Sequence, residues 1–487
     1  MTEPYDLFVI GGGVNGAAVA RDAAGRGLRV GLCERDDLAA HTSSASTKLI
    51  HGGLRYLEQG ALRLVREALS ERATLLRAAP HVVRPLGFVL PYHRGLRPAW
   101  MLRLGLVFYD RLGGRGPLPA SDRVSLRGGP LEAEYGFGFR YWDCRVDDAR
   151  LVVLNAIDAR ERGADILART ECVALRRRDD LWSVRLRFEG AEREVRTRAI
   201  VNAAGAWADG ISDGIAPHGK PRLRLVKGSH IVTRKLYAGE HAFIFQNPDR
   251  RIVFAIPFED DFTLIGTTDV AVRTPEEGER ISPDEIAYLC DAVNEYLVRN
   301  ATPDDVVWTF AGVRALHDDG DANPSRVSRD DRLILDADGA PSLSIIGGKL
   351  TTHRRVAERA LQKLAPYLPA MGAPWTADAV LPGGDLGGDF ENFVAALQRE
   401  YAWAPAASMR RLAGAYGTRA RIVLGDAVSI NDLGRGFGAD LYERELAYMM
   451  RHEFARTGED ALWRRSKLGL VLGEAERSAV DDWMRTT

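Results

Sequence analysis

The segment LFVIGGGVNG, residues 7–16, decides the fold. Its four apolar residues predict a short buried strand, and the three glycines after them predict a tight turn. Residues 14–26 are rich in alanine and predict a helix packed closely on a sheet, and residues 29–33 predict the next strand. The N-terminal part of the chain is therefore expected to be a βαβ unit, the building block of parallel sheets.

The spacing Gly11-x-Gly13-x-x-Gly16 within this unit is typical of dinucleotide-binding loops. The first glycine permits the turn, the second lets the backbone approach a pyrophosphate, and the third lets the helix pack on the strand. The helix N-terminus offers free N–H groups to the phosphates, and Glu34 can accept hydrogen bonds from the ribose. Because strand, helix and acidic residue stand at the expected offsets, the context favours a nucleotide site over a glycine-rich turn that binds nothing.

The rest of the sequence favours FAD over NAD as this dinucleotide. No second GxGxxG spacing occurs, so one dinucleotide is expected. Late in the chain, an apolar strand at residues 342–346 leads to Gly347-Gly348 and a helical run. A helix N-terminus there is suited to face the pyrimidine end of a flavin and to stabilise negative charge on the reduced ring.

Composition excludes several classes of function. With 66 basic and 67 acidic residues among 487, the chain has no overall field that would attract nucleic acid. The four cysteines lie far apart without CxxC spacing, which argues against a disulfide framework or a zinc site, and no metal is expected. There is no signal-peptide pattern, and the apolar stretch at residues 99–109 is too short to span a bilayer. A cytoplasmic or membrane-surface protein is expected.

Sequence patterns outside the first unit predict further domains. Residues 62–76 carry apolar side chains at helical spacing, and residues 252–256 and 262–266 predict antiparallel strands joined by an acidic turn. Residues 382–388 (PGGDLGG) predict a linker. Only helical patterns follow, so residues 383–487 are expected to form a separate helical domain.

A hydroxyl-rich segment, TSSASTK at residues 42–48, precedes LIHGGLRY at residues 49–56. Such loops suit close approach to a phosphate or a flat ring, although a solvated loop is the alternative interpretation. Arginine forks bind phosphomonoesters well. Six basic residues stand at strand ends or glycine-rich turns, where they either bind such a group or lie on the solvated surface: Lys48, Arg55, Lys227, Arg314, Arg329 and Lys349.

Three histidines are candidate proton acceptors. His230 follows Lys227-Gly228-Ser229 and precedes an apolar pair, so it is either a core residue or the group that takes a proton from a substrate alcohol. His317 and His353 are weaker candidates of the same kind.

With these residues in view, the sequence resembles the FAD-dependent sn-glycerol-3-phosphate dehydrogenases of bacterial respiration. The resemblance covers nearly the whole chain and is most specific between residues 43 and 56. It is carried by IGGGVNG (10–16), TSSASTKLIHGGLRYL (42–57), LRPAWM (96–101), DDARL (147–151), KGSH (227–230), IGTTD (265–269), GVR (312–314), GGKLTT (347–352) and ALWRR (461–465).

The resemblance implies an α/β (α+β overall) fold with three parts. The first is a Rossmann-like FAD-binding domain of the glutathione-reductase/D-amino-acid-oxidase type, at residues 1–75, 145–215 and 310–365. The second is an antiparallel-sheet substrate-binding or cap domain, at residues 76–144 and 216–309. The third is the C-terminal all-α domain, at residues 383–487. The implied reaction is oxidation of glycerol 3-phosphate to dihydroxyacetone phosphate, with electrons passed from FAD to membrane ubiquinone or menaquinone.

The resemblance also implies roles for individual residues. We hypothesise that His230 accepts the alcohol proton, that Lys349 and Arg314 stabilise alkoxide character, and that Lys349 is the rival base. Substrate-binding residues are expected to be Arg55, Tyr56, Arg329 and Thr268. Cofactor-binding residues are expected to be Gly11, Gly13, Asn15, Gly16, Glu34, Thr42, Ser43, Ser46, Lys48, Leu49, His51, Gly52, Gly53, Gly205, Trp207, Gly348, Leu350 and Thr351.

Residues 93–115 combine positive charge with apolar and aromatic side chains. This segment contains five arginines (94, 97, 103, 111 and 115) and one acidic residue, Asp110, which gives a local charge of +4 (5 − 1). This composition suits an interfacial helix on anionic lipid, although an ordinary helix with a solvated face is the alternative. With the family resemblance, peripheral attachment to the inner face of the cytoplasmic membrane is expected, and a homodimer is allowed.

Three other functions stay open. A soluble oxidase of the same fold would pass electrons to oxygen and release peroxide. An amine or amino-acid oxidase would share the nucleotide loop but prefer a carboxylate substrate. A non-enzymatic nucleotide sensor is disfavoured by the polar segment that ends at Tyr56.

Overall fold

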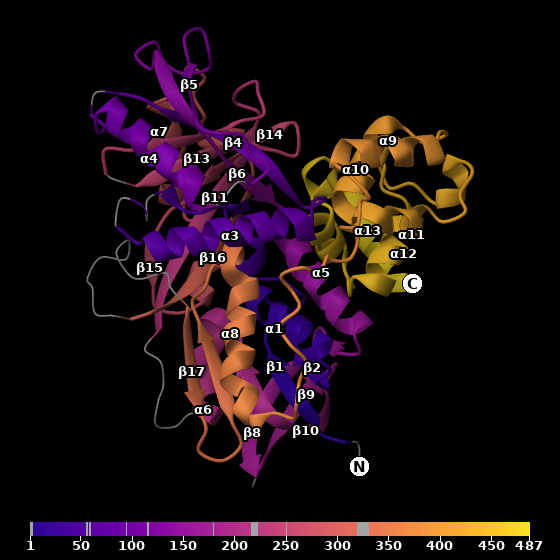
Figure 1. Cartoon of the computed structure of the whole chain (residues 1–487). Coiled ribbons are helices and arrows are strands. Elements are labelled where there is room, and N and C mark those ends of the chain that lie inside the picture. The colour runs from indigo at the N-terminus through magenta and orange to yellow at the C-terminus, as the bar shows by residue number, and fades with distance from the viewer. Residues whose placement is uncertain are drawn as a thin grey trace.

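The computed structural model describes residues 3–54, 57, 60–93, 95–113, 116–178, 180–215, 223–249, 251–318 and 331–487. Two sheets and a C-terminal group of helices make up the molecule (Figure 1). Helix α5 (Asp148–Glu161) lies between the N-terminal sheet and the C-terminal helices. The expected mixed α/β fold with a helical C-terminal part is confirmed.

The N-terminal sheet has the expected parallel core. Strands run in the order β17 (Arg332–Asp336), β18 (Ser342–Ile346), β10 (Ala191–Asn202), β1 (Tyr5–Ile10), β2 (Val30–Cys33) and β7 (Asp165–Leu167). All neighbours are parallel except the β17–β18 pair. Strands β8 (Glu171–Arg178) and β9 (Leu181–Phe188) extend β10 as an antiparallel ribbon. The carboxyl ends of the parallel strands meet at one edge, where ligands bind in open α/β sheets.

Helices cover this sheet because its strands are apolar on both faces. Helix α1 (Val14–Gly25) packs between α5 and α8 (His353–Leu364), and its alanines allow the close approach expected from the sequence. Residues 7–10 of β1 are buried. The short helix α6 (Ala208–Ile215) follows β10. A parallel strand buried on both faces explains the continuous apolar run that opens the chain.

The second sheet is mainly antiparallel. Its order is β15 (Val270–Val272), β11 (Leu223–Arg234), β14 (Phe262–Gly266), β13 (Ile252–Phe258), β12 (Ala242–Gln246), β4 (Val83–Pro91), β6 (Phe137–Val146) and β3 (Leu49–Ile50). Strand β16 (Val306–His317) pairs with β11, and β5 (Asp122–Ser125) pairs with β6. The predicted antiparallel pair at residues 252–266 is confirmed. Since β16 pairs with β11 from end to end, it belongs to this sheet, whereas the expected domain limit at residue 310 falls inside it.

Three helices accompany this sheet: α3 (Leu62–Ala78), α4 (Ala99–Leu112) and α7 (Pro283–Asn294). Helix α3 contains the predicted amphipathic segment, and α4 contains most of the basic apolar one. Within the described ranges, every helix is too short or too polar to cross a bilayer.

The C-terminal region packs around its own apolar core, which includes Leu397, Met409 and Leu446. Its helices are α9 (Phe390–Glu400), α10 (Ala406–Tyr416), α11 (Ala420–Leu424), α12 (Glu443–His452) and α13 (Glu474–Thr486). Between α12 and α13, residues Asp460–Arg465 form one π-helical turn. Such turns are rare and frequently occur at functional positions.

Candidate active site

A cavity of about 750 Å³ lies between the two sheets. Its lining includes Glu34, Arg35 and Trp207, which follow strands of the first sheet, and Arg251 and Phe254, which lie at β13 of the second. Its walls come from segments that follow β1, β2, β10 and β18, from β11, β13 and β16 of the second sheet, and from the residues after β14. The cavity therefore opens at the carboxyl edge of the parallel strands, as expected for a nucleotide site.

The first turn of the chain has room only for glycine. Gly11 has a φ of +110°, and a Cβ there would lie 2.5 Å from the carbonyl oxygen of Ala203. A Cβ on Gly16 would lie 1.9 Å from the carbonyl oxygen of Gly11. The turn thus brings the N-terminus of α1, which carries no acidic residue in its first turn, to the cavity wall. Free N–H groups and a positive dipole end suit a pyrophosphate.

Glu34 and its surroundings form one end of the cavity. Its carboxylate accepts hydrogen bonds from the backbone N–H groups of Gly12 (2.7 Å) and Asp36 (2.9 Å), while burial raises its pKa. The Trp207 ring lies 4.4 Å from the His41 ring and 4.3 Å from the Arg35 guanidinium. A carboxylate for ribose hydroxyls beside a cation and aromatic rings suits the adenosine half of a dinucleotide.

The hydroxyl-rich segment lies along the cavity and is held by hydrogen bonds from behind. Thr42 donates to the carbonyl of Val313 (2.7 Å), and Ser43 accepts from the N–H of Val14 (3.0 Å). Ser46 donates to Asp148 (2.7 Å). This segment is therefore a structured wall rather than a solvated loop.

Lys48 anchors that wall and does not line the cavity. Its ammonium is buried and contacts Asp148 (2.7 Å) and the carbonyl of Ser44 (2.8 Å). Sequence reasoning missed the role of Asp148, although it lies within the quoted DDARL match. The pair of carboxylates Asp147 and Asp148 at the start of α5 was the available signal.

The opposite end of the nucleotide wall is formed by β18 and the glycines after it. Gly347 and Gly348 have φ values of +73° and +90°, and the Asn15 amide donates to the carbonyl of Gly347 (3.2 Å). The Asn15 Oδ1 atom is buried and has no partner among the described residues. A glycine cradle, a bare helix N-terminus and an unpaired buried acceptor fit an FAD molecule with its flavin near residues 347–351.

Two basic side chains reach the wall beside this cradle. Arg314 pairs with Asp269 and lies 3.4 Å from the Thr267 hydroxyl. Lys349 also lines the cavity. Thr267 and Asp269 were not among the expected site residues. Both residues flank Thr268 in the IGTTD match, and this position in the motif was the sequence signal that could have identified them.

His230 lies one layer behind the wall. Its Nε2 atom is 3.0 Å from the hydroxyl of Thr47, which does line the cavity, and its ring stacks on Phe310 at 4.9 Å. The ring occupies the space left by Gly266, where a Cβ would lie 2.0 Å from the His230 Cδ2. Burial lowers the pKa of His230 well below its ordinary 6.5, and the charges of Arg314 and Lys48 act in the same direction. The imidazole is therefore neutral at neutral pH.

Thr268 also lies behind the wall. Its hydroxyl donates to Glu285 (2.8 Å) and accepts from the N–H of Ser229 (3.0 Å). Glu285 in turn pairs with the buried Lys227 (2.6 Å). These four residues stabilise the sheet under the site and offer no free group to a substrate within the described structure.

The structure brings most of the expected site residues to one cavity. Three expected residues lie outside the described ranges: Arg55, Tyr56 and Arg329. Five lie behind the cavity wall: Gly16, Lys48, Gly52, His230 and Thr268. The others line it: Gly11, Gly13, Asn15, Glu34, Thr42, Ser43, Ser46, Leu49, His51, Gly53, Gly205, Trp207, Arg314, Gly348, Lys349, Leu350 and Thr351.

Comparison with known proteins identifies the family. Residues 6–354 match the family model described as FAD dependent oxidoreductase, and residues 374–486 match the C-terminal domain of alpha-glycerophosphate oxidase. A glycerol-3-phosphate dehydrogenase of Pseudomonas aeruginosa is 50% identical over 100% of this chain and 96% of its own length. The chain belongs to the FAD-dependent glycerol-3-phosphate dehydrogenase family. It is therefore an enzyme, and FAD is its cofactor.

Two further members of this family are informative. A D-erythritol 1-phosphate dehydrogenase of Brucella abortus is 49% identical over 99% of this chain and 98% of its own length. The crystal structure of the glycerol-3-phosphate dehydrogenase of Bacillus halodurans, complexed with FAD, matches with a TM-score of 0.76 and 28% identity. That match covers 99% of this chain and 94% of the other.

Proposed function

We propose that this enzyme oxidises sn-glycerol 3-phosphate to dihydroxyacetone phosphate with FAD and passes the electrons to a membrane quinone. The observation that carries the proposal is that Arg314, Lys349 and Thr47 all line the cavity that fits FAD, with Thr47 hydrogen-bonded to His230. Secondary alcohol oxidation needs positive charge for a developing alkoxide and an acceptor for its proton.

Arg314 and Lys349 supply the positive charge. The pairing of Arg314 with Asp269 holds the guanidinium at the wall, where it can face the oxygen of an alcohol. The Lys349 side chain enters the same cavity from the turn after β18. Both cations lower the energy of alkoxide character at C2.

His230 receives the proton through Thr47. The Thr47 hydroxyl lies between the cavity and the His230 Nε2, so it can pass one proton inward while taking another from the C2 hydroxyl. A neutral imidazole has the free nitrogen lone pair that this transfer needs. Lys349 is the rival proton acceptor.

Acceptance of the hydride that leaves C2 is the chemistry that FAD would supply when bound. The residues of this chain orient the alcohol against it, and the arginine pair Arg55 and Arg329, with Tyr56, is proposed to bind the phosphate. All three lie outside the described residues, so this part rests on the family resemblance.

An anaerobic absorption spectrum tests the proposal. The purified protein should show flavin bands that bleach when sn-glycerol 3-phosphate is added without oxygen. Glycerol and the sn-glycerol 1-phosphate enantiomer serve as controls and should leave the bands unchanged. Flavin that stays oxidised with sn-glycerol 3-phosphate would contradict the proposal.

A second substrate, D-erythritol 1-phosphate, has a specific observation in its favour. The relative from Brucella abortus bears that name and is 49% identical to this chain, almost the same identity as the P. aeruginosa glycerol-3-phosphate dehydrogenase. Comparing kcat/KM for the two substrates distinguishes them. A higher kcat/KM for D-erythritol 1-phosphate would identify that compound, and not glycerol 3-phosphate, as the physiological substrate.

Peripheral attachment to the inner membrane face is part of the proposal. Trp100, Leu104 and Phe108 form an exposed apolar stripe along α4, with exposed fractions of 67%, 62% and 44%. The exposed Arg97 and Arg111 flank the stripe. An apolar stripe between basic residues suits insertion into an anionic lipid surface.

The identity of the electron acceptor is tested by measuring which product forms, reduced quinone or peroxide. With substrate and FAD present, a quinone analogue should be reduced at the enzyme's full rate and little peroxide should form in air. Peroxide formation that matches substrate consumption would identify the oxidase alternative instead.

A further inference from the structure

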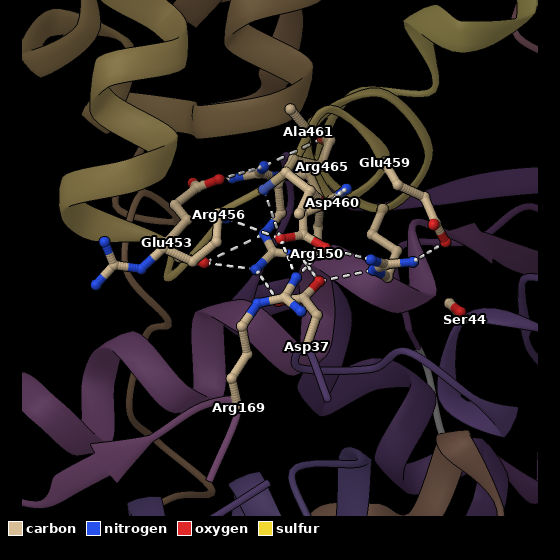
Figure 2. Close-up of polar contacts among 12 residues, drawn as sticks. Asp37, Ser44, Arg150, Arg169, Glu453, Arg456, Glu459, Asp460, Ala461 and Arg465 are labelled. Atoms are coloured by element: carbon tan, nitrogen blue, oxygen red, sulfur yellow. Dashed lines mark hydrogen bonds and ion pairs between the residues drawn. The ribbon is translucent and has the colours of Figure 1, made fainter. Parts of the chain in front are cut away.

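A network of buried charges joins the C-terminal helices to the cofactor side of the molecule (Figure 2). It centres on the π-helical turn Asp460–Arg465. Asp460 accepts a hydrogen bond from Arg169 (2.7 Å) and pairs with Arg464. Asp460 also accepts from the backbone N–H groups of Arg456 (2.8 Å) and Thr457 (3.0 Å). The turn therefore presents two arginines and one carboxylate in a fixed arrangement.

Both arginines of the turn bind Asp37. Arg464 Nε lies 2.6 Å from the Asp37 Oδ2, and Arg465 contacts both carboxylate oxygens at 2.5 and 2.8 Å. Asp37 is 2% exposed and Arg465 is fully buried. Arg465 also donates to the carbonyl of Glu453 at 2.6 Å, so its guanidinium has little freedom to move. Removing Asp37 would leave the buried Arg465 without its carboxylate partner, whereas removing Arg465 would leave Asp37 paired with Arg464 alone.

Asp37 lies on the back of the segment that forms the ribose end of the cavity. Glu34 and Arg35 precede it, and the residues from Ala39 to Ser43 follow it, and all of these line the cavity. Asp37 itself points away, toward the C-terminal helices. One side of this segment therefore faces the cavity, and its other side is anchored by Arg464 and Arg465.

A neighbouring segment of the ribose end is anchored to the same turn. Arg169, whose side chain binds Asp460, donates its backbone N–H to the carbonyl of Asp36 (2.9 Å). The next residue, Thr170, donates its N–H to the carbonyl of Glu34 (2.6 Å) and lines the cavity. Two segments that are more than 120 residues apart in the chain thus converge on Asp460–Arg465.

We propose that Asp37, Arg464, Arg465 and Arg169 are positioning residues for FAD, and that the C-terminal domain serves to hold the adenosine end of the cofactor site in its binding geometry. These residues do not touch the cavity, so they act through the position of the Glu34 carboxylate and its neighbours. The inference concerns cofactor retention and does not depend on which phosphorylated alcohol is oxidised.

The test measures FAD release from the holoenzyme. The protein is diluted stepwise, and the rise in free flavin fluorescence gives the dissociation constant of FAD. Asp37→Asn should raise this constant by about tenfold or more, within the usual range for coupling between sites. Arg465→Gln should do the same, and the double variant should be no worse than either single variant, because the two residues act as one unit.

A matched control separates positioning from general loss of stability. Glu445 is a buried carboxylate of the C-terminal domain that binds Arg411 through both oxygens at 2.7 Å but lies away from the cofactor segment. Glu445→Gln should lower the melting temperature as Asp37→Asn does, yet leave the FAD dissociation constant unchanged. If Glu445→Gln released FAD equally well, or if Asp37→Asn retained FAD like the wild type, the inference would be wrong.

A milder variant covers the case in which Asp37→Asn does not fold. The Arg169 side chain is 34% exposed, and in Arg169→Gln the buried Asp460 keeps its ion pair with Arg464, so no buried charge loses every partner. It should raise the FAD dissociation constant severalfold, and Arg169→Lys should restore part of the loss. Wild-type FAD retention in Arg169→Gln would contradict a positioning role for the turn.

Discussion

At the scale of single residues, the site depends on contacts one layer behind the cavity surface. Thr47 touches both the cavity and His230, whereas His230 itself is covered. Proton transfer from an alcohol to His230 then requires the hydroxyl of Thr47 as an intermediate carrier. The residue that sequence reasoning singled out, His230, and the residue that lines the cavity, Thr47, are neighbours rather than the same group.

The first prediction concerns this hydroxyl. Thr47→Val keeps the shape of the side chain but removes its O–H, so we expect the rate of flavin reduction to fall about 10²-fold, in the range of general-base effects. Thr47→Ser keeps the hydroxyl and should lose only a few-fold. Anaerobic stopped-flow absorption measures both. A Thr47→Val enzyme that reduces flavin at the wild-type rate would exclude the relay and favour Lys349.

The second prediction concerns Gly16. Its missing side chain lets α1 lie against the turn, and an alanine Cβ would be 1.9 Å from the Gly11 carbonyl oxygen. Gly16→Ala should therefore displace the helix N-terminus from the pyrophosphate position and yield protein with little FAD. The ratio of flavin to protein absorbance measures this. Gly105→Ala is the control, because a Cβ there meets nothing within 4 Å in helix α4, and it should keep its full FAD content.

At the scale of elements, α4 differs from the other described helices in what it leaves exposed. Only Leu106 and Tyr109 of its side chains are buried, while aromatic and aliphatic residues face outward. An exposed apolar stripe of this kind on a soluble helix normally marks a contact surface. Arginines that flank such a stripe suit an anionic surface.

The third prediction follows from this stripe. Replacing Trp100 and Leu104 with serine removes two exposed apolar side chains without disturbing the core, so the fold should be kept. Binding to vesicles of anionic phospholipid should weaken about 100-fold or more, since burying such side chains stabilises by about 1.5–3 kcal/mol each and about 1.4 kcal/mol corresponds to tenfold. Vesicle co-sedimentation measures the change. Val428→Ser, at a valine that is 78% exposed on the C-terminal domain, should bind vesicles like the wild type.

At the scale of the whole molecule, the C-terminal domain meets the rest of the chain around buried polar groups. His81 lies at this junction, beside Gly383 of the linker and Gly417 of the C-terminal region. Neither ring nitrogen has a hydrogen-bond partner among the described residues. Burial, with the charges of Arg150 and Arg84, lowers the pKa of His81 to about 3.

The fourth prediction is a loss of stability in mild acid. Above pH 6.5 His81 is neutral in both the folded and the unfolded chain, and it has no effect on pH dependence. Below pH 6.5 only the unfolded chain takes up the proton, so the folded state loses about 1.4 kcal/mol per pH unit until the folded pKa is reached. The melting temperature of the wild type should thus fall between pH 6.5 and 5 more steeply than that of His81→Leu. Parallel pH profiles would contradict this assignment.

How much of this site could be predicted depends on the range of the interactions involved. The GxGxxG turn, Glu34 and the residues from Thr42 to Ser46 follow from local spacing, because a turn and a helix N-terminus are built from consecutive residues. Arg314 and Lys349 line the cavity, as expected from the GVR and GGKLTT motifs that contain them. The buried position of His230 could not be predicted, since a strand pattern does not say which of two faces meets the cavity. Lys48 and Thr268 lie outside the strands, and their burial depends on tertiary contacts with Asp148 and Glu285.

The amino-acid sequence by itself determined the family, the βαβ unit, the helical C-terminal region and the choice of FAD, because each rests on short-range periodicity or on motifs of adjacent residues. Only the tertiary structure decided that Asp37 and Arg169 are anchored by Asp460–Arg465, that Asp148 holds Lys48, and that Thr47 separates His230 from the cavity. Those contacts join residues about 100 to 430 positions apart. Their pairing depends on how whole sheets and helices pack, and the charge of an isolated residue carries no information about the partner it will meet.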